Sequence, residues 1–496
     1  MAEKTGSFLE KLCISVTLAF AGVILLQTAL VGLTGGKYTA AFLLGLVGTG
    51  VLVWLGTKLP EPGRAFPAAL FALRFLIALA VILTVQTQPV QDFNTMYEAA
   101  QQMAVGSREY LYPQTSYAGA YAVASDVTAR YFYDWAYQTG FAAYEAALLA
   151  VFGPAQRSLQ IANALWMAGT GCLVYGIAER FLSKKAAMAV SLLYALYPGP
   201  YLLAGVLTNQ HIAALFYYLA VYLLVQKEKL SCPRAVLAGA AIAVGNIMRP
   251  IGVVVLLAIL CWGVVRIFSG KEKRMRGVLL LAAVLVSFFV VFKAADLAVS
   301  LSGLNPEGLA NNRPMWKFLL GLNSASTGQW NRTDYDRFFV YPLESDEAML
   351  DAVLDRMGKG PGEYLRLFWG KLRILISQQD AAYWGFGHLK GTAVNAFLVA
   401  LTYLDRGLVF TVFLLVAAAL VLYLKKGMEE SKLSLLLGFL FCGYLSVHLI
   451  IEVQVRYRYF IMPVVFLLAG MAVEYLLQKK KALSGEKAFS ADSEGS

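Results

Sequence analysis

Long apolar runs separated by short polar loops dominate this chain. A membrane-spanning helix needs about 20 apolar residues. Twelve runs approach that length, at residues 12–33, 38–58, 66–88, 158–182, 186–205, 209–226, 234–248, 250–266, 277–299, 407–424, 432–452 and 459–478. We therefore expect an all-α polytopic membrane protein with about twelve transmembrane helices, extracytoplasmic loops and juxtamembrane helices.

Two apolar stretches depart from simple spanning. Ala142–Phe152 is too short to cross a bilayer, so we expect a re-entrant or interfacial helix there. The stretch Arg234–Arg266 is interrupted by Arg249 and Pro250. Since proline breaks a helix and disfavours helical backbone before it, we predict a hairpin of two short helices. Its bend exposes Arg249 towards the outer half of the membrane.

The basic residues between the runs set the orientation, because Lys and Arg favour cytoplasmic loops. They fall on one side of the predicted arrangement and place both termini inside, at Lys58, Arg64, Arg180, Lys184, Lys185, Lys227, Lys229, Arg266, Lys271, Lys273, Lys425, Lys426 and Lys479. Two long segments, about 89–157 and 300–406, then lie outside.

This topology divides the chain into five parts. We expect an N-terminal transmembrane pair (1–65), a membrane core (66–299) that includes the first outer loop (89–157), an extracytoplasmic cap (300–406), C-terminal transmembrane helices (407–478) and a cytoplasmic tail (479–496).

Composition supports the membrane class and excludes others. The 496 residues are 59% hydrophobic and 15% charged, whereas soluble domains carry about 25% charged residues. The net charge of +11 comes from residues clustered in short loops, which indicates topology rather than nucleic-acid binding. None of the five cysteines lies in the long outer loops, so we expect no disulfide framework.

One acid marks the mouth of a membrane helix. Asp92 follows the apolar run 66–88 almost at once. A carboxylate at that position is costly to desolvate, which makes it a functional candidate. Asp134 is the second candidate catalytic acid, in the same outer loop.

Further polar residues are predicted at the same membrane depth. His448 and Glu452 are four residues apart, so they share a helix face that Arg456 continues if the helix persists. We interpret Arg74 and Arg458 as snorkelling or locally paired side chains. The remaining candidates for contact with substrate are Gln138, Asn209 and His211.

These residue types suit sugar transfer from a phosphate leaving group. A carboxylate takes the proton of the acceptor hydroxyl, and cations stabilise the phosphate as it leaves. Asp92 is placed for the first role. Arg249 and Arg456 suit the second, because guanidinium groups match phosphate oxygens.

Six segments carry a family resemblance over about 92–463. They read QDFNTMYEAAQQMAVG, YDWAYQTGFAAYEAALLAVFG, LYALYPGPYLLAGVLTNQH, GNIMRPIG, FLLGLNSASTGQWN and HLIIEVQVRYRYFIMP. In their order and placement the chain resembles the GT-C superfamily of integral-membrane glycosyltransferases, nearest the bacterial protein-mannosyltransferase-like and aminoarabinose-transferase-like branch.

The resemblance implies an inverting transferase that uses a polyprenyl-phosphate sugar on the extracytoplasmic face of the plasma membrane. It implies that Asp92 is the catalytic acid, that Trp135–Phe152 is the polar re-entrant segment, and that Arg249 is the basic phosphate-binding bend. Relatives often carry a second acid where this chain has Asn209. A divalent metal therefore stays open as a cofactor, with Asp134 as an alternative ligand.

Other functions remain as alternatives. A lipid-linked glycan polymerase or ligase, or a lipid or polymer transporter, could also use an outer cavity rich in arginine. We see no internal repeat, which disfavours an inverted-repeat transporter. The sequence names neither the sugar, hexose or pentose, nor the acceptor, which could be a glycan, a lipid or a protein.

Overall fold

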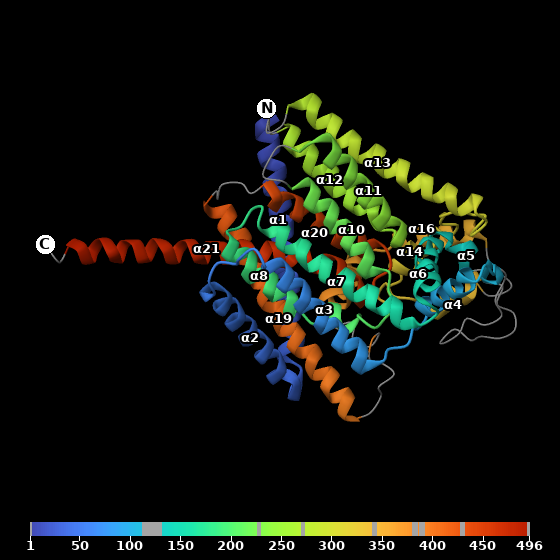
Figure 1. The fold of residues 1–496 in the computed structure, drawn as a ribbon, viewed down its shortest axis with the longest axis horizontal. Helices are drawn as coiled ribbons and strands as arrows, with labels where there is room; N and C mark the ends of the chain where they lie inside the picture. The colour runs from blue at the N-terminus through green and yellow to red at the C-terminus, as the bar shows by residue number, and fades with distance from the viewer. Residues whose placement is uncertain are drawn as a thin grey trace.

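The protein is a bundle of helices in a computed structural model (Figure 1). The structure describes residues 2–111, 131–225, 230–268, 273–339, 345–378, 385, 392–426 and 432–493, and none of these residues lies in a strand. Residues 112–130 of the predicted first outer loop lie outside this set. The all-α class is confirmed.

Each predicted span corresponds to a helix. Their bounds are α1 (Ala2–Leu33), α2 (Thr39–Lys58), α3 (Phe66–Val85), α7 (Gln156–Ala178), α8 (Lys184–Leu196), α10 (Gln210–Leu224), α11 (Cys232–Met248), α12 (Gly252–Phe268), α13 (Arg274–Leu301), α19 (Thr392–Lys426), α20 (Lys432–Ile450) and α21 (Arg458–Ser493). Within the described residues, seven are long and apolar enough to cross a membrane, namely α1, α2, α3, α7, α13, α19 and α21. Four shorter apolar helices, α10, α11, α12 and α20, accompany them.

Several predicted boundaries differ from the structure. The span 186–205 is divided, because α8 ends at Leu196 and the short α9 (Gly199–Leu202) follows. Pro198 and Pro200 explain this break, since each lacks the N–H that a continuing helix needs. Helix α19 begins at Thr392 rather than 407, and α21 continues to Ser493 through the predicted tail.

The predicted hairpin at Pro250 is present between α11 and α12. Arg249 leaves the helix with φ −149° and ψ 120°, as expected for a residue before proline. The Asn246 Oδ1 atom accepts a hydrogen bond of 2.9 Å from the Gly252 N–H at the start of α12. Tyr217 Oη donates to the Arg249 carbonyl at 2.7 Å. Side chains of α10 and α11 therefore hold the bend in place.

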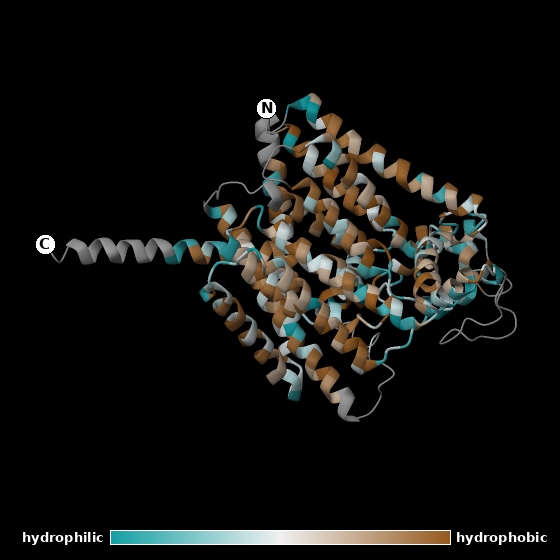
Figure 2. Cartoon of the chain, viewed as in Figure 1, coloured by the Kyte–Doolittle hydropathy of each residue, from teal (hydrophilic) through white to brown (hydrophobic). Residues whose placement is uncertain are grey.

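The apolar surfaces of the long helices face outward as well as inward. On α13, Val286, Val290 and Leu297 are each more than half exposed, and most of the long helices are coloured as hydrophobic in Figure 2. A soluble protein rarely leaves such continuous apolar faces open to water. This pattern is typical of helices that contact lipid.

Shorter helices gather at one end of the bundle (Figure 1). They are α4 (Asp92–Ala104), α5 (Tyr131–Asp134), α6 (Thr139–Phe152), α14 (Trp316–Gly321), α15 (Arg332–Phe339), α16 (Asp346–Met357) and α17 (Pro361–Leu372). A separate apolar cluster, which includes Trp316, Leu320, Phe338 and Phe339, holds part of this end together. Of the predicted cap (300–406), this end contains the described residues of 302–372, and the name cap refers to these residues from here on.

Two arginines that we interpreted as snorkelling are instead buried. Arg74 donates to the carbonyls of Met167 (3.1 Å) and Tyr194 (2.9 Å) and stacks on the Tyr194 ring. Gly171 of α7 leaves room for it, because a Cβ atom there would overlap the Arg74 side chain. Interhelical carbonyl groups thus replace the water that a snorkelling arginine would reach.

Arg458 is buried for a different reason. It pairs with Asp405 at 2.5 Å and donates to the Ile376 carbonyl at 3.1 Å. The acid that neutralises it comes from α19, a partner that is distant in sequence. The interpretation as a snorkelling side chain was therefore wrong, because the guanidinium is buried and paired.

Candidate active site

A polar cavity lies where the start of α4, residues 137–138, the α11–α12 bend, the cap and the end of α20 meet. Its volume, counted as the space that the centres of water molecules can occupy, is about 320 Å³. Its wall is formed by Asp92, Tyr137, Gln138, Asn209, Asn246, Ile247, Arg249, Pro250, Ile251, Phe292, Leu309, Asn311, Lys317, His448, Ile451, Glu452, Arg456 and Tyr457. Seven of the nine predicted site residues are among these.

Asp92 is placed by an unusual backbone step. Gln91, directly before it, has φ 52° and ψ −133°, a conformation that side chains other than glycine rarely adopt. Backbone strain of this kind persists only where the surroundings impose it, and it is often found at functional sites. Helix α4 begins at Asp92, whose side chain is 43% exposed and lies 3.8 Å from Arg456.

Arg456 is held rigidly opposite Asp92. Its Nε donates to Gln454 Oε1 at 2.6 Å, its guanidinium lies over the Phe93 ring, and its carbonyl accepts from Gln210. The side chain is 5% exposed. A guanidinium fixed in this way loses little conformational entropy when it binds an anion.

Arg249 reaches the same cavity from the hairpin bend. Its Nη1 donates to Asn209 Oδ1 at 2.9 Å, and its guanidinium lies 4.9 Å from the centre of the Tyr457 ring. Asn209 in turn donates to the Met248 carbonyl at 3.0 Å. The neutral amide therefore orients Arg249 without cancelling its charge.

Glu452 is neutralised within the wall. It pairs with Lys317 of α14 and accepts from Tyr457 Oη at 3.1 Å and from Gln454 at 2.8 Å. Burial alone would raise the pKa of Glu452, but Lys317 and these hydrogen bonds outweigh it, and the pKa lies below its usual value. The carboxylate correspondingly raises the pKa of Lys317 against the effect of burial. Both groups are charged at neutral pH.

The prediction that His448 and Glu452 share one helix face was wrong, and the helix does not persist to Arg456. Helix α20 ends at Ile450, and Arg456 belongs to a short 3-10 turn. The helix ends because the chain pairs with the cap, where the N–H groups of Glu452 and Val453 donate to the carbonyls of Lys317 and Gly328, both at 2.8 Å. All three side chains nevertheless reach the cavity.

Two predicted residues do not line the cavity. Asp134 is buried and pairs with Arg313 at 3.0 Å. His211 is fully buried, with its ring nitrogens against Tyr459 Oη (2.8 Å) and the Leu203 carbonyl (3.0 Å). Both side chains have partners within the protein and lie outside the wall of this cavity.

Among the cavity residues that the sequence analysis did not single out, Lys317, Tyr137 and Tyr457 carry polar groups that bear on the chemistry. Lys317 lies within the apolar stretch Met315–Leu320 of the predicted cap, where nothing in the pattern marks it. Tyr137 and Tyr457 are aromatic residues of a kind common near membranes. Burial raises the pKa of Tyr137 to about 12, so it can donate a hydrogen bond at neutral pH.

Metal ligation finds no support in the part of the chain that the structure describes. There, no group of three or more His, Cys, Asp or Glu side chains is arranged to hold an ion. Asp134, the predicted alternative ligand, pairs with Arg313 among the described residues and not with a second acid.

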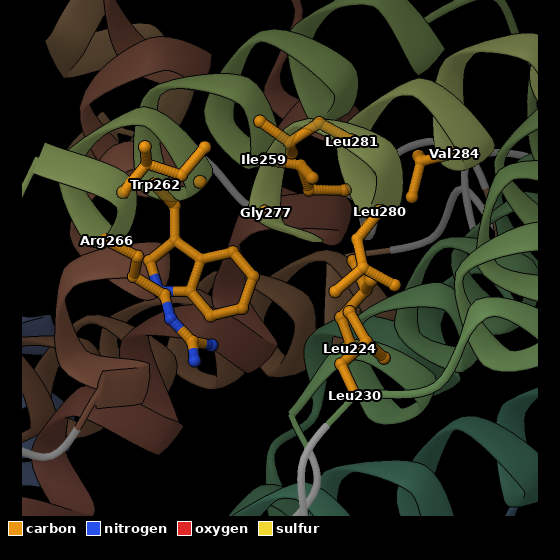
Figure 3. A pocket seen from close by; sticks show the side chains of 11 residues that line it. Leu224, Leu230, Ile259, Trp262, Arg266, Gly277, Leu280, Leu281 and Val284 are labelled. Carbon is orange, nitrogen blue, oxygen red and sulfur yellow. The ribbon is translucent and has the colours of Figure 1, made fainter. Parts of the chain in front are cut away.

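A second pocket lies at the other end of α12 and is chemically different. It is small, with about 40 Å³ available to the centres of water molecules, and its wall includes Leu224, Ile259, Trp262, Leu280 and Val284. Figure 3 shows Arg266 beside the Trp262 ring, 4.8 Å from the ring centre. The wall carries no acid, so this pocket offers apolar contact but no acid–base chemistry.

Comparisons with known proteins agree with the architecture. Residues 140–294 match the model of the dolichyl-phosphate-mannose-protein mannosyltransferase family. This match confirms the predicted likeness to the GT-C superfamily of membrane glycosyltransferases.

One solved structure and the curated proteins complete the comparison. The archaeal oligosaccharyltransferase AglB from Archaeoglobus fulgidus, solved with an inhibitory peptide and a dolichol-phosphate, is 14% identical with a TM-score of 0.42. The match covers 85% of this chain and 52% of that one, so the chain spans about half the length of that protein. No curated protein matches.

Proposed function

We propose that this protein transfers a sugar from a polyprenyl-phosphate donor to an extracytoplasmic acceptor, with inversion at the anomeric carbon. Asp92 is the general base, and Arg249 and Arg456 bind the phosphate. The observation that carries the proposal is one half-exposed carboxylate in the same cavity as two guanidinium groups, each held by hydrogen bonds.

The charge of the cavity suits a monophosphate donor. Three cations (Arg249, Lys317 and Arg456) and two carboxylates (Asp92 and Glu452) line it, which leaves one net positive charge. A sugar joined to a lipid through one phosphate is a diester with one negative charge. A diphosphate-linked glycan carries two, so the balance favours transfer over polymerisation.

Asp92 is the carboxylate available to accept a proton. Glu452 is held by Lys317, Gln454 and Tyr457, whereas Asp92 lies 3.8 Å from Arg456, beyond hydrogen-bond distance. The acceptor oxygen attacks the anomeric carbon and gives its proton to Asp92. The bond from that carbon to the phosphate oxygen breaks, and polyprenyl phosphate leaves with the electron pair.

The remaining wall suits the rest of the donor. Gln138 Oε1 is buried without a hydrogen-bond partner among the described residues, so it can accept from a sugar hydroxyl, beside Asn209 and His448. Ile247, Ile251 and Phe292 form an apolar part of the wall. We assign this side to the first isoprene units, because the lipid tail has to remain in the bilayer.

The Asp92→Asn variant tests the assignment of the base. General-base catalysis contributes about 100- to 10,000-fold, so transfer should fall by that factor, while donor binding stays close to wild type. The measurement is turnover of radiolabelled donor by purified protein in lipid, beside a donor-binding isotherm. Normal turnover in this variant would remove Asp92 from the mechanism.

A further inference from the structure

Lys371 is a fully buried lysine outside the cavity wall, in the last turn of α17. Its Nζ donates to three backbone carbonyls, those of Gly321 (2.7 Å), Leu449 (2.9 Å) and Ile451 (2.7 Å). An ammonium group has three N–H donors. Each donor therefore has one acceptor, which is unusual for a charge without a carboxylate in direct contact.

The three carbonyls belong to the elements that carry the cavity's ion pair. Gly321 ends α14, the helix of Lys317. Leu449 lies in the last turn of α20, where carbonyls lack partners within the helix. Ile451 directly precedes Glu452. The Lys371 side chain thus joins the cap to Leu449, just before the end of α20, and to Ile451, just after it.

Glycines make room for this junction. Gly328 has φ 74°, and a Cβ there would lie 2.7 Å from Lys371 Cε. At Gly321 a Cβ would overlap the Ile450 carbonyl. The segment GLNSASTG therefore wraps closely around the lysine, and the Gly328 carbonyl accepts from the Val453 N–H at 2.8 Å.

We propose that Lys371 is a positioning residue that locks residues 451–453 against the cap, and so fixes Glu452 and Lys317 in the cavity wall. It acts through Ile451 and Gly321 and touches no substrate. The role follows from the three carbonyls that it joins. Its effect on transfer rests on the proposed function, but its effect on the backbone does not.

The lock depends on the charge of the amine. Burial lowers the pKa of Lys371 to about 7, although the Glu452 carboxylate acts in the opposite direction. Two titratable groups of the described residues interact with it electrostatically, Glu452 and His448 of α20. Below pH 7 the ammonium satisfies all three carbonyls. Above it, a neutral amine has two N–H groups and leaves one carbonyl unmatched.

Hydrogen exchange tests the lock directly. In Lys371→Met, the amides of Glu452 and Val453 should exchange faster than in wild type. In Lys371→Arg, which keeps the charge, both amides should exchange more slowly than in Lys371→Met. The exposed Lys359→Met is the matched control and should behave as wild type. Transfer by Lys371→Met should fall by about 100-fold, the effect of a misplacement of about 1 Å. Wild-type exchange at both amides in Lys371→Met would overturn the proposal.

A second measurement needs no variant, in case Lys371→Met does not fold. In wild-type protein, exchange at Glu452 and Val453, corrected for the intrinsic rate, should accelerate as pH rises through about 7. The Ala348 amide, bonded to Ser345 in the cap, is the internal reference and should not accelerate. Equal pH dependence at all three amides would overturn the lock. A wild type that transfers no sugar would refute the proposed function, while exchange still decides the role of Lys371.

Discussion

The cap and the cavity each contain an aspartate paired with an arginine, and the two pairs differ in how closely the charged groups approach. In the cap, Arg356 holds Asp334 through two hydrogen bonds, of 2.7 and 3.0 Å, and also donates to the Leu319 carbonyl. In the cavity, Arg456 stands 3.8 Å from Asp92, which is 43% exposed. In the cap pair both carboxylate oxygens of Asp334 accept hydrogen bonds from Arg356. In the cavity pair the two groups are not hydrogen-bonded, and the Asp92 carboxylate stays open to the cavity.

This difference distinguishes the two paired acids from Asp92, the acid that we propose as the base. A carboxylate with two close donors has its lone pairs committed and contributes to stability only while its partner is present. A half-exposed carboxylate that no arginine holds by a hydrogen bond keeps its lone pairs open to an acceptor hydroxyl. Asp134, paired with Arg313 at 3.0 Å, belongs with the cap pair. Asp92 alone of these acids has the open geometry.

The largest expected effect on stability is in the cap. Asp334→Asn leaves Arg356 without its counter-charge, which should cost about 3 kcal/mol. Asp92→Asn should change stability by less than about 0.5 kcal/mol. Thermal unfolding of both variants in detergent measures the contrast. Equal losses of Tm would mean that the two pairs do not differ as described.

Arg456→Ala should have the next largest effect, on donor affinity. Removing a rigid charged donor to phosphate costs about 2–3 kcal/mol, so the Kd for a polyprenyl-phosphate sugar should rise by about 30- to 150-fold. The exposed Arg366→Ala is the matched control. An unchanged Kd in Arg456→Ala would remove this residue from the phosphate site.

Asn209→Asp should weaken donor binding by about tenfold, which corresponds to roughly 1.4 kcal/mol. The new carboxylate would pair with Arg249, now 2.9 Å from the amide oxygen, and would cancel the single net positive charge of the cavity. Asn209→Ser keeps a neutral acceptor and should bind nearly as well as wild type. If the two variants bound the donor equally, charge balance would not govern affinity.

A change of pH should affect transfer only slightly between pH 7 and 5. The pKa of Glu452 lies below its usual value, so the pair with Lys317 stays intact there and is lost as pH falls through that lowered pKa. Transfer measured from pH 7 downward should therefore stay nearly constant to about the unperturbed glutamate value of 4.3. A steep decline between pH 6 and 5 would contradict the assigned charge state.

The smallest effect should come from the apolar pocket at the other end of α12. Leu280→Phe adds volume to a wall that carries no acid, so donor affinity should stay within about twofold of wild type, under roughly 0.5 kcal/mol. The binding isotherm used for Arg456→Ala measures this. A tenfold loss would show that this pocket belongs to the donor site.

Local signals in the sequence predicted much of this architecture. Apolar run length located the helices, and Pro250 located the bend that presents Arg249. Asp92 stood out because an acid follows a membrane helix. In each case a signal lies within a few residues of the feature that it predicts.

The unpredicted features depend on contacts between distant parts of the chain. Lys317 and Glu452 are separated by 135 positions, and no pattern within either segment indicates the other. Helix α20 ends at Ile450 without a nearby proline or glycine, because the cap supplies competing hydrogen bonds. Asp134 and Asp92 both lie in the predicted first outer loop, and only the structure distinguishes them, through the burial of Asp134 and its contact with Arg313.

The most direct test of the account is transfer by purified wild-type protein in lipid, with paired polyprenyl-monophosphate and polyprenyl-diphosphate sugars. The cavity's single net positive charge predicts that monophosphate donors bind and release polyprenyl phosphate as the sugar is transferred, and that diphosphate donors bind more weakly. Turnover with diphosphate donors alone, or no binding of any monophosphate donor, would contradict the central claim.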